Sequence, residues 1–130
     1  MSVTQTAQEK ACRALLDAMT TTEKICQMLM PHFWSWRDSD GEDKPVTALR
    51  PEMAALLARH GFAGVILFAP NLRDSAGAAK LTADMQRANA AAVGRTGLII
   101  AVDPEGGDTT RLARGTCMPG SMALGAAGDP

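Results

Sequence analysis

The sequence lacks the long apolar runs, the excess positive charge and the paired cysteines that mark several classes of protein. No window approaches the roughly 20 apolar residues that a membrane helix requires, and the polar start, Met1 to Lys10, has no apolar stretch of the kind found in a signal peptide. Thirteen basic residues against fourteen acidic ones leave a formal net charge of −1, with no basic stripe for nucleic acid. We therefore expect a cytoplasmic protein with neither a membrane nor a nucleic-acid partner.

Cysteine and glycine motifs that bind metals or nucleotides are also missing. Cys12, Cys26 and Cys117 are odd in number and show no CxxC spacing, so we predict buried reduced thiols, with neither a disulfide framework nor a metal site. No GxGxxG follows an apolar run, and the stretch 120–125 (GSMALG) lacks the Lys and the Ser or Thr of a phosphate-binding loop. The sequence therefore indicates no nucleotide and no other cofactor.

The composition and the spacing of apolar residues indicate one α/β domain over residues 1–130. Hydrophobic residues make up 46% and charged residues 21%, close to the averages for soluble globular proteins. Two short apolar runs rich in β-branched residues predict strands buried on both faces, and the helical segment between them completes a strand–helix–strand unit, the repeat of a parallel sheet. The strands are predicted at 62–68 and 98–102, and the helices at 7–19, from Thr20, at 51–59 and from Asp74 or Ser75 to Val93.

The remaining segments have less definite patterns. The apolar run 25–30, ended by Pro31, fits either a helix end or a buried strand. Residues 33–45 mix aromatic and acidic residues, which favours a polar loop anchored by its aromatics. Residues 108–130 are rich in Gly, Ala, Pro and Met, and predict a long loop with a weak helical tendency at 121–127.

Two carboxylates directly follow the second predicted strand. Asp103 and Glu105 come after Val102, and ligands of parallel α/β sheets bind beyond the carboxyl ends of the strands. Side chains two residues apart on an extended segment point the same way, so a shared polar pocket is one interpretation. The other is structural: Asp103 braces a turn, and Glu105 pairs with Arg111 or faces water.

Three residues near the first apolar run allow either a binding or a packing interpretation. The rings of Trp34 and Trp36 could stack on a sugar face, although core packing or loop anchoring is the more common use. His32 stands where a binding site could form, but no serine or cysteine nucleophile motif accompanies it. His60 is interpreted as a helix-terminal residue that the helix dipole favours.

Five segments form an ordered series from about Thr20 to the end of the chain. They are TEKICQMLMP at 22–31, GVILF at 64–68 with Asn71, IAVDPEGG at 100–107, Arg111-Leu112, and MPGSMALGAAGD at 118–129. In this order they resemble N-terminal landmarks of glycoside hydrolase family 3, most closely its bacterial β-N-acetylhexosaminidase branch. The resemblance implies the N-terminal portion of a partial (β/α)8 TIM-type barrel with about three parallel strands, and a ligand site at their carboxyl ends.

The resemblance implies two substrate-binding residues. The Asp of the family's VDxEGG segment hydrogen-bonds hydroxyls of the sugar in the first subsite, which implies this role for Asp103. A sugar contact is implied for Arg111, because a guanidinium fork can hold hydroxyl oxygens. The chain departs from the family at Pro104, where Gln is usual, and at Cys26, where Gly is common, while Asp108 could pair with Arg111 and compete with the sugar.

The resemblance also implies catalytic groups that these 130 residues do not include. The family's retaining mechanism requires an Asp nucleophile and a separate acid/base from later in the barrel, and no His follows His60, so we assign no catalytic residue to this chain. We expect a fragment of a glycosidase of carbohydrate metabolism that acts on terminal β-N-acetylglucosamine. Such a fragment would be inactive alone and would have a missing C-terminal barrel portion as its partner. The alternatives are a standalone α/β ligand-binding module without catalysis and a β-glucosidase of the same family.

Overall fold

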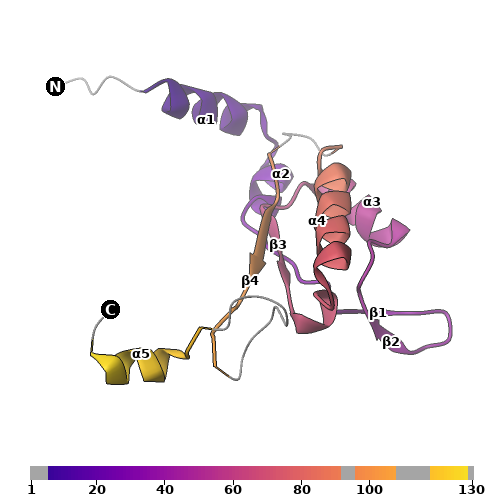
Figure 1. Cartoon of the computed structure of the whole chain (residues 1–130). Coiled ribbons are helices and arrows are strands. Elements are labelled where there is room, and N and C mark those ends of the chain that lie inside the picture. The colour runs from indigo at the N-terminus through magenta and orange to yellow at the C-terminus, as the bar shows by residue number, and fades with distance from the viewer. Residues whose placement is uncertain (1–5, 92–95, 108–117, 129–130) are drawn as a thin grey trace.

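Three parallel chain segments form the centre of the molecule. The computed structural model describes residues 6–91, 96–107 and 118–128, whose arrangement is shown in Figure 1. Strand β3 (Gly64–Leu67) pairs in parallel with β4 (Ile99–Val102). An isolated parallel bridge between His32 and Ile66 places a third segment along the other side of β3. Both predicted strands are confirmed, and the run 25–30 divides between the end of a helix and the approach to this third segment.

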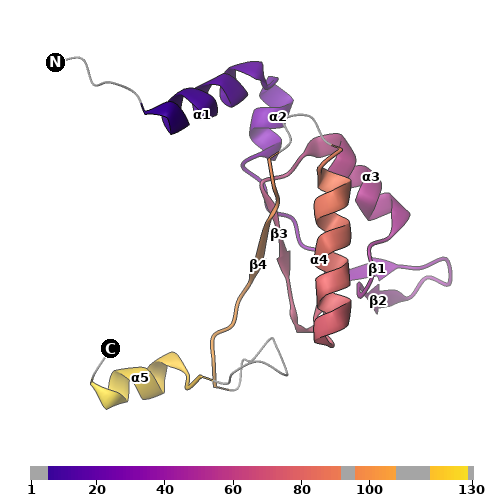
Figure 2. The same ribbon diagram turned by 45° about the horizontal axis from the view of Figure 1, so that its top comes forward.

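Two helices connect the three segments and lie together on one side of the sheet (Figures 1 and 2). Helix α3 (Pro51–His60) starts with proline in its first turn and ends at Gly61, whose φ of 59° suits glycine. Helix α4 (Ser75–Asn89) follows a short 3-10 turn, η1 (Ala69–Asn71), and begins where the Asp74 side chain accepts a hydrogen bond from the Gly77 amide. Both helices were predicted from these start signals, and α3 from the same end signal, whereas α4 ends at Asn89 and not at the predicted Val93.

The hydrophobic core lies between these helices and one face of the sheet. Val65 and Leu67 of β3 point into it and are almost fully buried, as is Met53 of α3. Side chains of a strand alternate between faces, so Ile100 and Val102 of β4 pack against the same core. The buried members of the cluster are Phe33, Val46, Met53, Leu57, Val65, Leu67, Leu72, Leu81, Met85 and Leu98.

The opposite face of the sheet is open in the part of the chain that the structure describes. Ile99 of β4 is 61% exposed there, and Met30 of the neighbouring segment is 40% exposed. Gly64 lies between them, and a Cβ at this position would come within 2.3 Å of the Ile99 carbonyl oxygen and 2.7 Å of the Met30 methyl carbon. The prediction that the second strand is buried on both faces is therefore wrong, because helices cover only one of them.

The N-terminal helices α1 (Ala7–Ala18) and α2 (Thr21–Cys26) both start with a capping box. The hydroxyl of Thr20 accepts from the Glu23 amide, while the Glu23 carboxylate accepts from the Thr20 amide at 2.7 Å. Helix α1 has no buried residue and projects away from the sheet (Figure 2). Cys12 on α1 is exposed, which contradicts the prediction of a buried thiol, whereas Cys26 is buried and Cys117 lies outside the described residues.

A hairpin replaces the polar loop predicted after the first apolar run. Strands β1 (Ser35–Arg37) and β2 (Asp43–Pro45) pair antiparallel. The turn between them includes Gly41, whose φ is 81°, and an ion pair of 2.9 Å joins Arg37 to Asp43. The acidic composition obscured these short strands, which have an exposed charged face.

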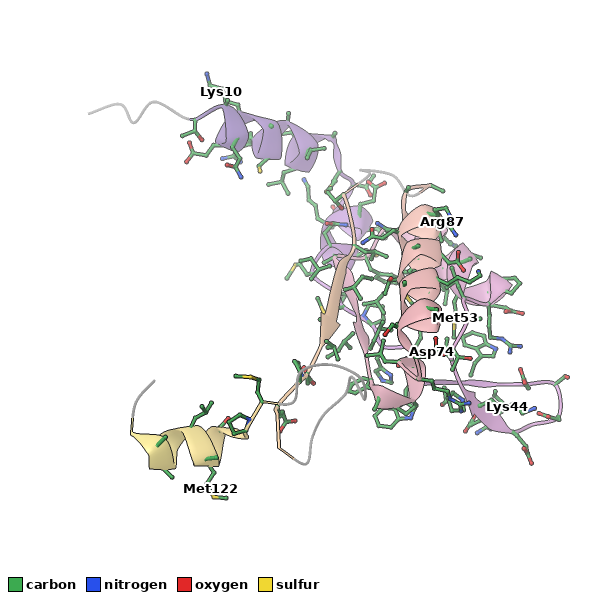
Figure 3. All side chains as sticks on the ribbon, in the orientation of Figure 1. Lys10, Lys44, Met53, Asp74, Arg87 and Met122 are labelled. Atoms are coloured by element: carbon green, nitrogen blue, oxygen red, sulfur yellow. The ribbon has the colours of Figure 1, made fainter. Side chains whose placement is uncertain are left out.

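The last helix, α5 (Ser121–Ala127), stands in the stretch predicted as a long loop with a weak helical tendency. It has no buried residue, and Met122 points into solvent far from Met53 in the core (Figure 3). Its sequence forms a helix between Gly120 and the left-handed Gly128. None of the helices within residues 6–91, 96–107 and 118–128 has the length and apolar content of a membrane span.

Candidate functional site at the carboxyl end of the sheet

Register places three side chains in a row where the parallel segments end. Leu67 pairs with Val102, so the next positions across the sheet are Phe68 and Asp103. The bridge between residues 32 and 66 extends the same row to Trp34. Leu67 and Val102 pack against the core, so alternation places these three residues on the open face. The Asp103 side chain is exposed.

Two aromatic rings of this row are in contact. The ring centroids of Trp34 and Phe68 are 4.8 Å apart, with 35° between the planes. His32 contacts Phe68 edge-on, at 6.0 Å and 87°. Trp34 is nevertheless 44% exposed, whereas Trp36 is half-buried and packs against the core. The packing interpretation therefore holds for Trp36, and Trp34 remains available to a ligand.

A buried amide positions the backbone beneath these rings. Asn71 donates from Nδ2 to the carbonyl oxygens of Phe33 at 2.9 Å and Val46 at 2.8 Å, with a longer contact of 3.3 Å to that of Trp34. Its Oδ1 accepts from the Phe68 amide at 2.9 Å. One side chain thus joins three separate segments of the site. Sequence reasoning noted Asn71 only within the family pattern, because local spacing cannot show which distant carbonyls it meets.

Glycines shape the chain after Asp103. Gly106 and Gly107 have φ values of 75° and 55°, which favour glycine. A Cβ on Gly106 would lie 2.8 Å from the Met118 carbonyl oxygen, and the Gly107 amide donates to that oxygen at 3.0 Å. The glycine pair therefore allows the segment after Asp103 to turn against residue 118. Glu105 is exposed like Asp103, and the second predicted binding residue, Arg111, lies outside the described residues.

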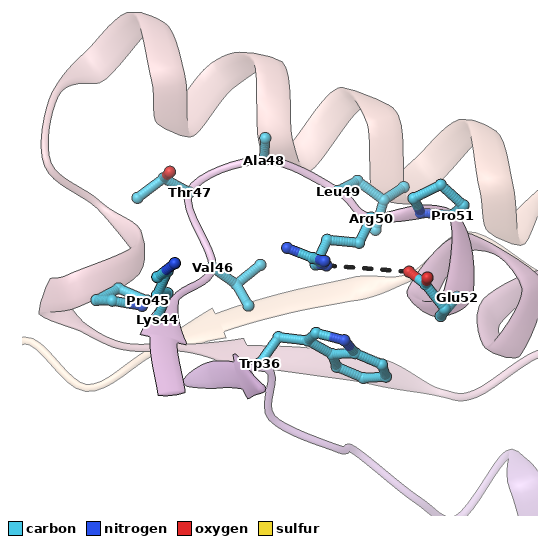
Figure 4. A pocket seen from close by; sticks show the side chains of 10 residues that line it. All are labelled: Trp36, Lys44, Pro45, Val46, Thr47, Ala48, Leu49, Arg50, Pro51 and Glu52. Atoms are coloured by element: carbon cyan, nitrogen blue, oxygen red, sulfur yellow. Dashed lines mark ion pairs between the residues drawn. The ribbon is translucent and has the colours of Figure 1, made fainter. Parts of the chain in front are cut away.

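A hollow of about 510 Å³ lies elsewhere, between the hairpin and the start of α3 (Figure 4). Its charged groups are largely paired: Arg50 lies 2.6 Å from Asp38 and 3.9 Å from Glu52, and Lys44 lies 3.3 Å from Asp38. A hydrogen bond from Lys44 holds the pKa of the Asp40 carboxyl below its ordinary value. Asp103 does not line this hollow, so the hollow is a weaker candidate for the ligand site than the carboxyl end of the sheet. The lining residues are Trp36, Lys44, Pro45, Val46, Thr47, Ala48, Leu49, Arg50, Pro51 and Glu52.

The amino end of the sheet has two side chains of metal-binding type, Cys26 and His60. The Cys26 Sγ lies 3.9 Å from the His60 Nδ1. Two such ligands do not make a typical zinc site, which takes four. Within the described ranges, no group of three His, Cys, Asp or Glu side chains could hold a metal ion.

Comparison with known proteins agrees with this architecture. Residues 20–130 match the model of the glycosyl hydrolase family 3 N-terminal domain. The chain is 35% identical over 118 residues to beta-hexosaminidase A of Pseudoalteromonas piscicida, a match that covers 83% of this chain and 19% of that protein.

Two solved structures are similar in fold and in sequence. A family 3 β-N-acetylglucosaminidase from Paenibacillus sp. str. FPU-7 superposes with a TM-score of 0.69 at 35% identity, covering 86% of this chain and 19% of that one. A fungal multi-domain family 3 β-N-acetylglucosaminidase superposes with a TM-score of 0.68 at 32% identity, covering 84% of this chain and 12% of that one. The chain thus spans a fifth or less of the length of these relatives. Its family model, its relative and its structural neighbours agree, and the chain belongs to glycoside hydrolase family 3.

Proposed function

We propose that the chain contributes part of the sugar-binding end of a (β/α)8-type barrel in a retaining hydrolase that removes terminal β-linked N-acetylglucosamine. The observation that carries this proposal is an exposed Asp103 at the carboxyl end of β4, within a chain that the family 3 N-terminal domain model matches over residues 20–130. The relatives named above are a β-hexosaminidase and β-N-acetylglucosaminidases, which supports the substrate class. In parallel α/β folds this edge of the sheet is where ligands bind.

Asp103 is proposed to hold the sugar through its hydroxyl groups. An ionised carboxylate is a charged acceptor, and hydrogen bonds to charged groups are stronger than neutral ones. Arg111 is proposed as the second contact, since its guanidinium donates to oxygens in a fixed planar geometry. Neither residue takes part in bond cleavage in this proposal; both orient the sugar.

Bond cleavage is proposed to require groups that follow later in the family's barrel. A retaining glycosidase uses two carboxyl groups or their equivalents, one as nucleophile and one as acid/base. Asp103 and Arg111 have neither role by resemblance. We therefore expect the 130-residue chain to bind sugar weakly and to hydrolyse none.

A standalone binding module is the competing function, and the open face of the sheet argues against it. Met30 and Ile99 leave apolar surface in solvent on that face, and α1 and α5 bury no residue. Contiguous exposed apolar surface usually marks a contact with more protein. The open face therefore favours a chain that works as part of a larger barrel.

The test combines turnover with binding on the purified chain. A chromogenic N-acetyl-β-glucosaminide measures hydrolysis, and heteronuclear NMR titration with N-acetylglucosamine measures binding. Asp103→Asn keeps the shape of the side chain and removes its charge, and we expect it to weaken binding about tenfold or more. Asp17→Asn, at an exposed position on α1, is the matched control and should leave binding unchanged.

Each outcome separates one part of the proposal. Binding that Asp103→Asn weakens and Asp17→Asn leaves unchanged, without turnover, supports the proposal as stated. Turnover above that of an Asp103→Ala control contradicts the inference that the catalytic groups lie elsewhere. Binding that is insensitive to Asp103 contradicts its contact with the sugar.

A further inference from the structure

Trp34 is a large apolar side chain that the fold holds partly in solvent. Its neighbour two residues on, Trp36, packs against the core, so the hairpin does not need both rings for its own packing. Trp34 lies instead against Phe68, at 4.8 Å between ring centroids, with 44% of its surface exposed. Two rings thus form one aromatic surface with a free side.

The position of this surface is set by strand register. Phe68 and Asp103 lie one residue beyond the last pair of β3 and β4, Leu67 and Val102, and Trp34 lies two residues beyond the bridge from His32 to Ile66, so continued register places the three in one row. Adjacent strands lie about 4.8 Å apart, so the aromatic surface and the carboxylate are close enough for one small ring to reach both. All three residues belong to the open face of the sheet.

The backbone beneath the aromatic surface is held in place. The Asn71 amide contacts the carbonyl oxygens of Phe33, Trp34 and Val46, and it accepts from the Phe68 amide. Asn71 is 2% exposed. A surface built on a buried hydrogen-bond network loses little conformational freedom when a ligand binds, which favours affinity.

We propose that Trp34 and Phe68 form a stacking platform for the pyranose ring whose hydroxyls Asp103 holds, an inference that rests on the function proposed above. A β-gluco-configured pyranose has equatorial hydroxyls at its rim and C–H groups on its faces. The C–H face of the pyranose can stack on an aromatic ring, and the hydroxyls at its rim can donate hydrogen bonds to the neighbouring Asp103 carboxylate. Trp34 provides the larger and more exposed part of the platform, and Phe68 lies beside it on the middle segment, between Trp34 and Asp103.

The composition of the chain makes this platform directly observable. The sequence has two tryptophans, so the indole N–H region of a nitrogen–proton correlation spectrum should show two signals. Trp36→Phe assigns them by removing one. Titration with methyl N-acetyl-β-glucosaminide should shift the Trp34 indole signal and leave that of Trp36 in place.

Variants at Trp34 separate stacking from general apolar contact. Trp34→Leu should weaken sugar binding about two- to tenfold, the range expected for one aromatic contact. Trp34→Phe keeps a ring and should restore much of that loss, and Trp36→Phe should leave affinity unchanged. The dispersion of the backbone amide signals checks that each variant is folded.

The outcomes distinguish the platform from the proposed function. Binding that Asp103→Asn weakens and Trp34→Leu does not would overturn the platform and leave the proposed function in place. Binding that depends on Trp34 and not on Asp103 would support the platform and overturn the proposed contact of Asp103. An absence of binding to the wild-type chain would overturn both.

Discussion

Replacing Asn71 by alanine should destabilise this chain more than the same replacement at Asn89. Both side chains are 2% exposed, and both variants remove the same volume, so the cavity contribution is similar. Their hydrogen bonds differ. Asn71 has strong contacts with two carbonyl oxygens and one amide, whereas Asn89 donates to the Thr96 carbonyl at 2.8 Å and its Oδ1 has no hydrogen-bond partner among the described residues.

The magnitude follows from the polar groups left without partners. Each buried group that loses its hydrogen bond costs at least about 1 kcal/mol, so Asn71→Ala, which orphans three such groups, should lower the free energy of unfolding by about 3 kcal/mol or more. At the same cost per group, Asn89→Ala orphans one carbonyl and should cost about 1 kcal/mol. The expected difference of about 2 kcal/mol is a large share of the stability of a small domain.

Urea unfolding followed by tryptophan fluorescence and by circular dichroism measures both changes. The midpoint should fall further for Asn71→Ala, with a similar slope for the two variants. Failure of Asn71→Ala to fold, with Asn89→Ala folded, agrees in direction with the calculation. Equal destabilisation by the two variants would contradict this prediction, because it would show that the four contacts of Asn71 contribute no more than the single one of Asn89.

Three further predictions concern the sheet, the helix starts and the hairpin. Gly64→Ala should unfold or strongly destabilise the chain, because its Cβ would lie 2.3 Å from the Ile99 carbonyl oxygen. Gly77→Ala on α4 is the control: its Cβ would lie 3.4 Å from the Asp74 carboxylate, and it should raise the free energy of unfolding in urea by about 0.5–1 kcal/mol. Thr20→Ala removes the N-cap of α2 and should lower the free energy of unfolding by about 1 kcal/mol. Thr6→Ala removes the N-cap of α1 and should reduce only the helix content, because α1 has no buried residue. A hydrogen bond from the Arg37 guanidinium holds the pKa of Asp43 below its ordinary 3.8. The contribution of this ion pair to stability is therefore fully present above pH 3.8 and is lost as the pH falls through the lower pKa of the folded state. NMR titration of the carboxyl carbon should show the pKa rising toward 3.8 at high salt, and an unchanged value would contradict the ion pair.

Local signals in the sequence predicted most elements because the signals act over a few residues. Pro51 and Gly61 bound α3, and Asp74 caps α4, as their positions in the sequence indicated. The apolar runs 62–68 and 98–102 predicted β3 and β4, because β-branched and aromatic residues are enriched in strands. These features depend on backbone preference and side-chain periodicity, both of which are readable without a fold.

The errors occur where neighbours decide. Ile99 belongs to an apolar run that is typical of a fully buried strand, yet one face of β4 is open. Burial of a strand depends on which elements cover the two faces of the sheet. The hairpin after Trp34 was predicted as a loop, since strands of three residues with charged side chains produce little pattern. Cys12 was predicted to be buried because free cysteines usually are, but it is exposed on α1, a helix without a buried residue.

The parallel α/β unit, the carboxylate after its second strand and the resemblance to the family could all be predicted from the sequence. The row of Trp34, Phe68 and Asp103, and the hydrogen bonds by which Asn71 joins the backbone of that site, became visible only in the fold. The physical reason is that strand register and buried hydrogen bonds join residues 25 to 38 positions apart, and such pairings are set by the packing of the whole sheet against its helices. Sequence spacing therefore identified the candidate carboxylate, Asp103, and the fold identified its neighbours.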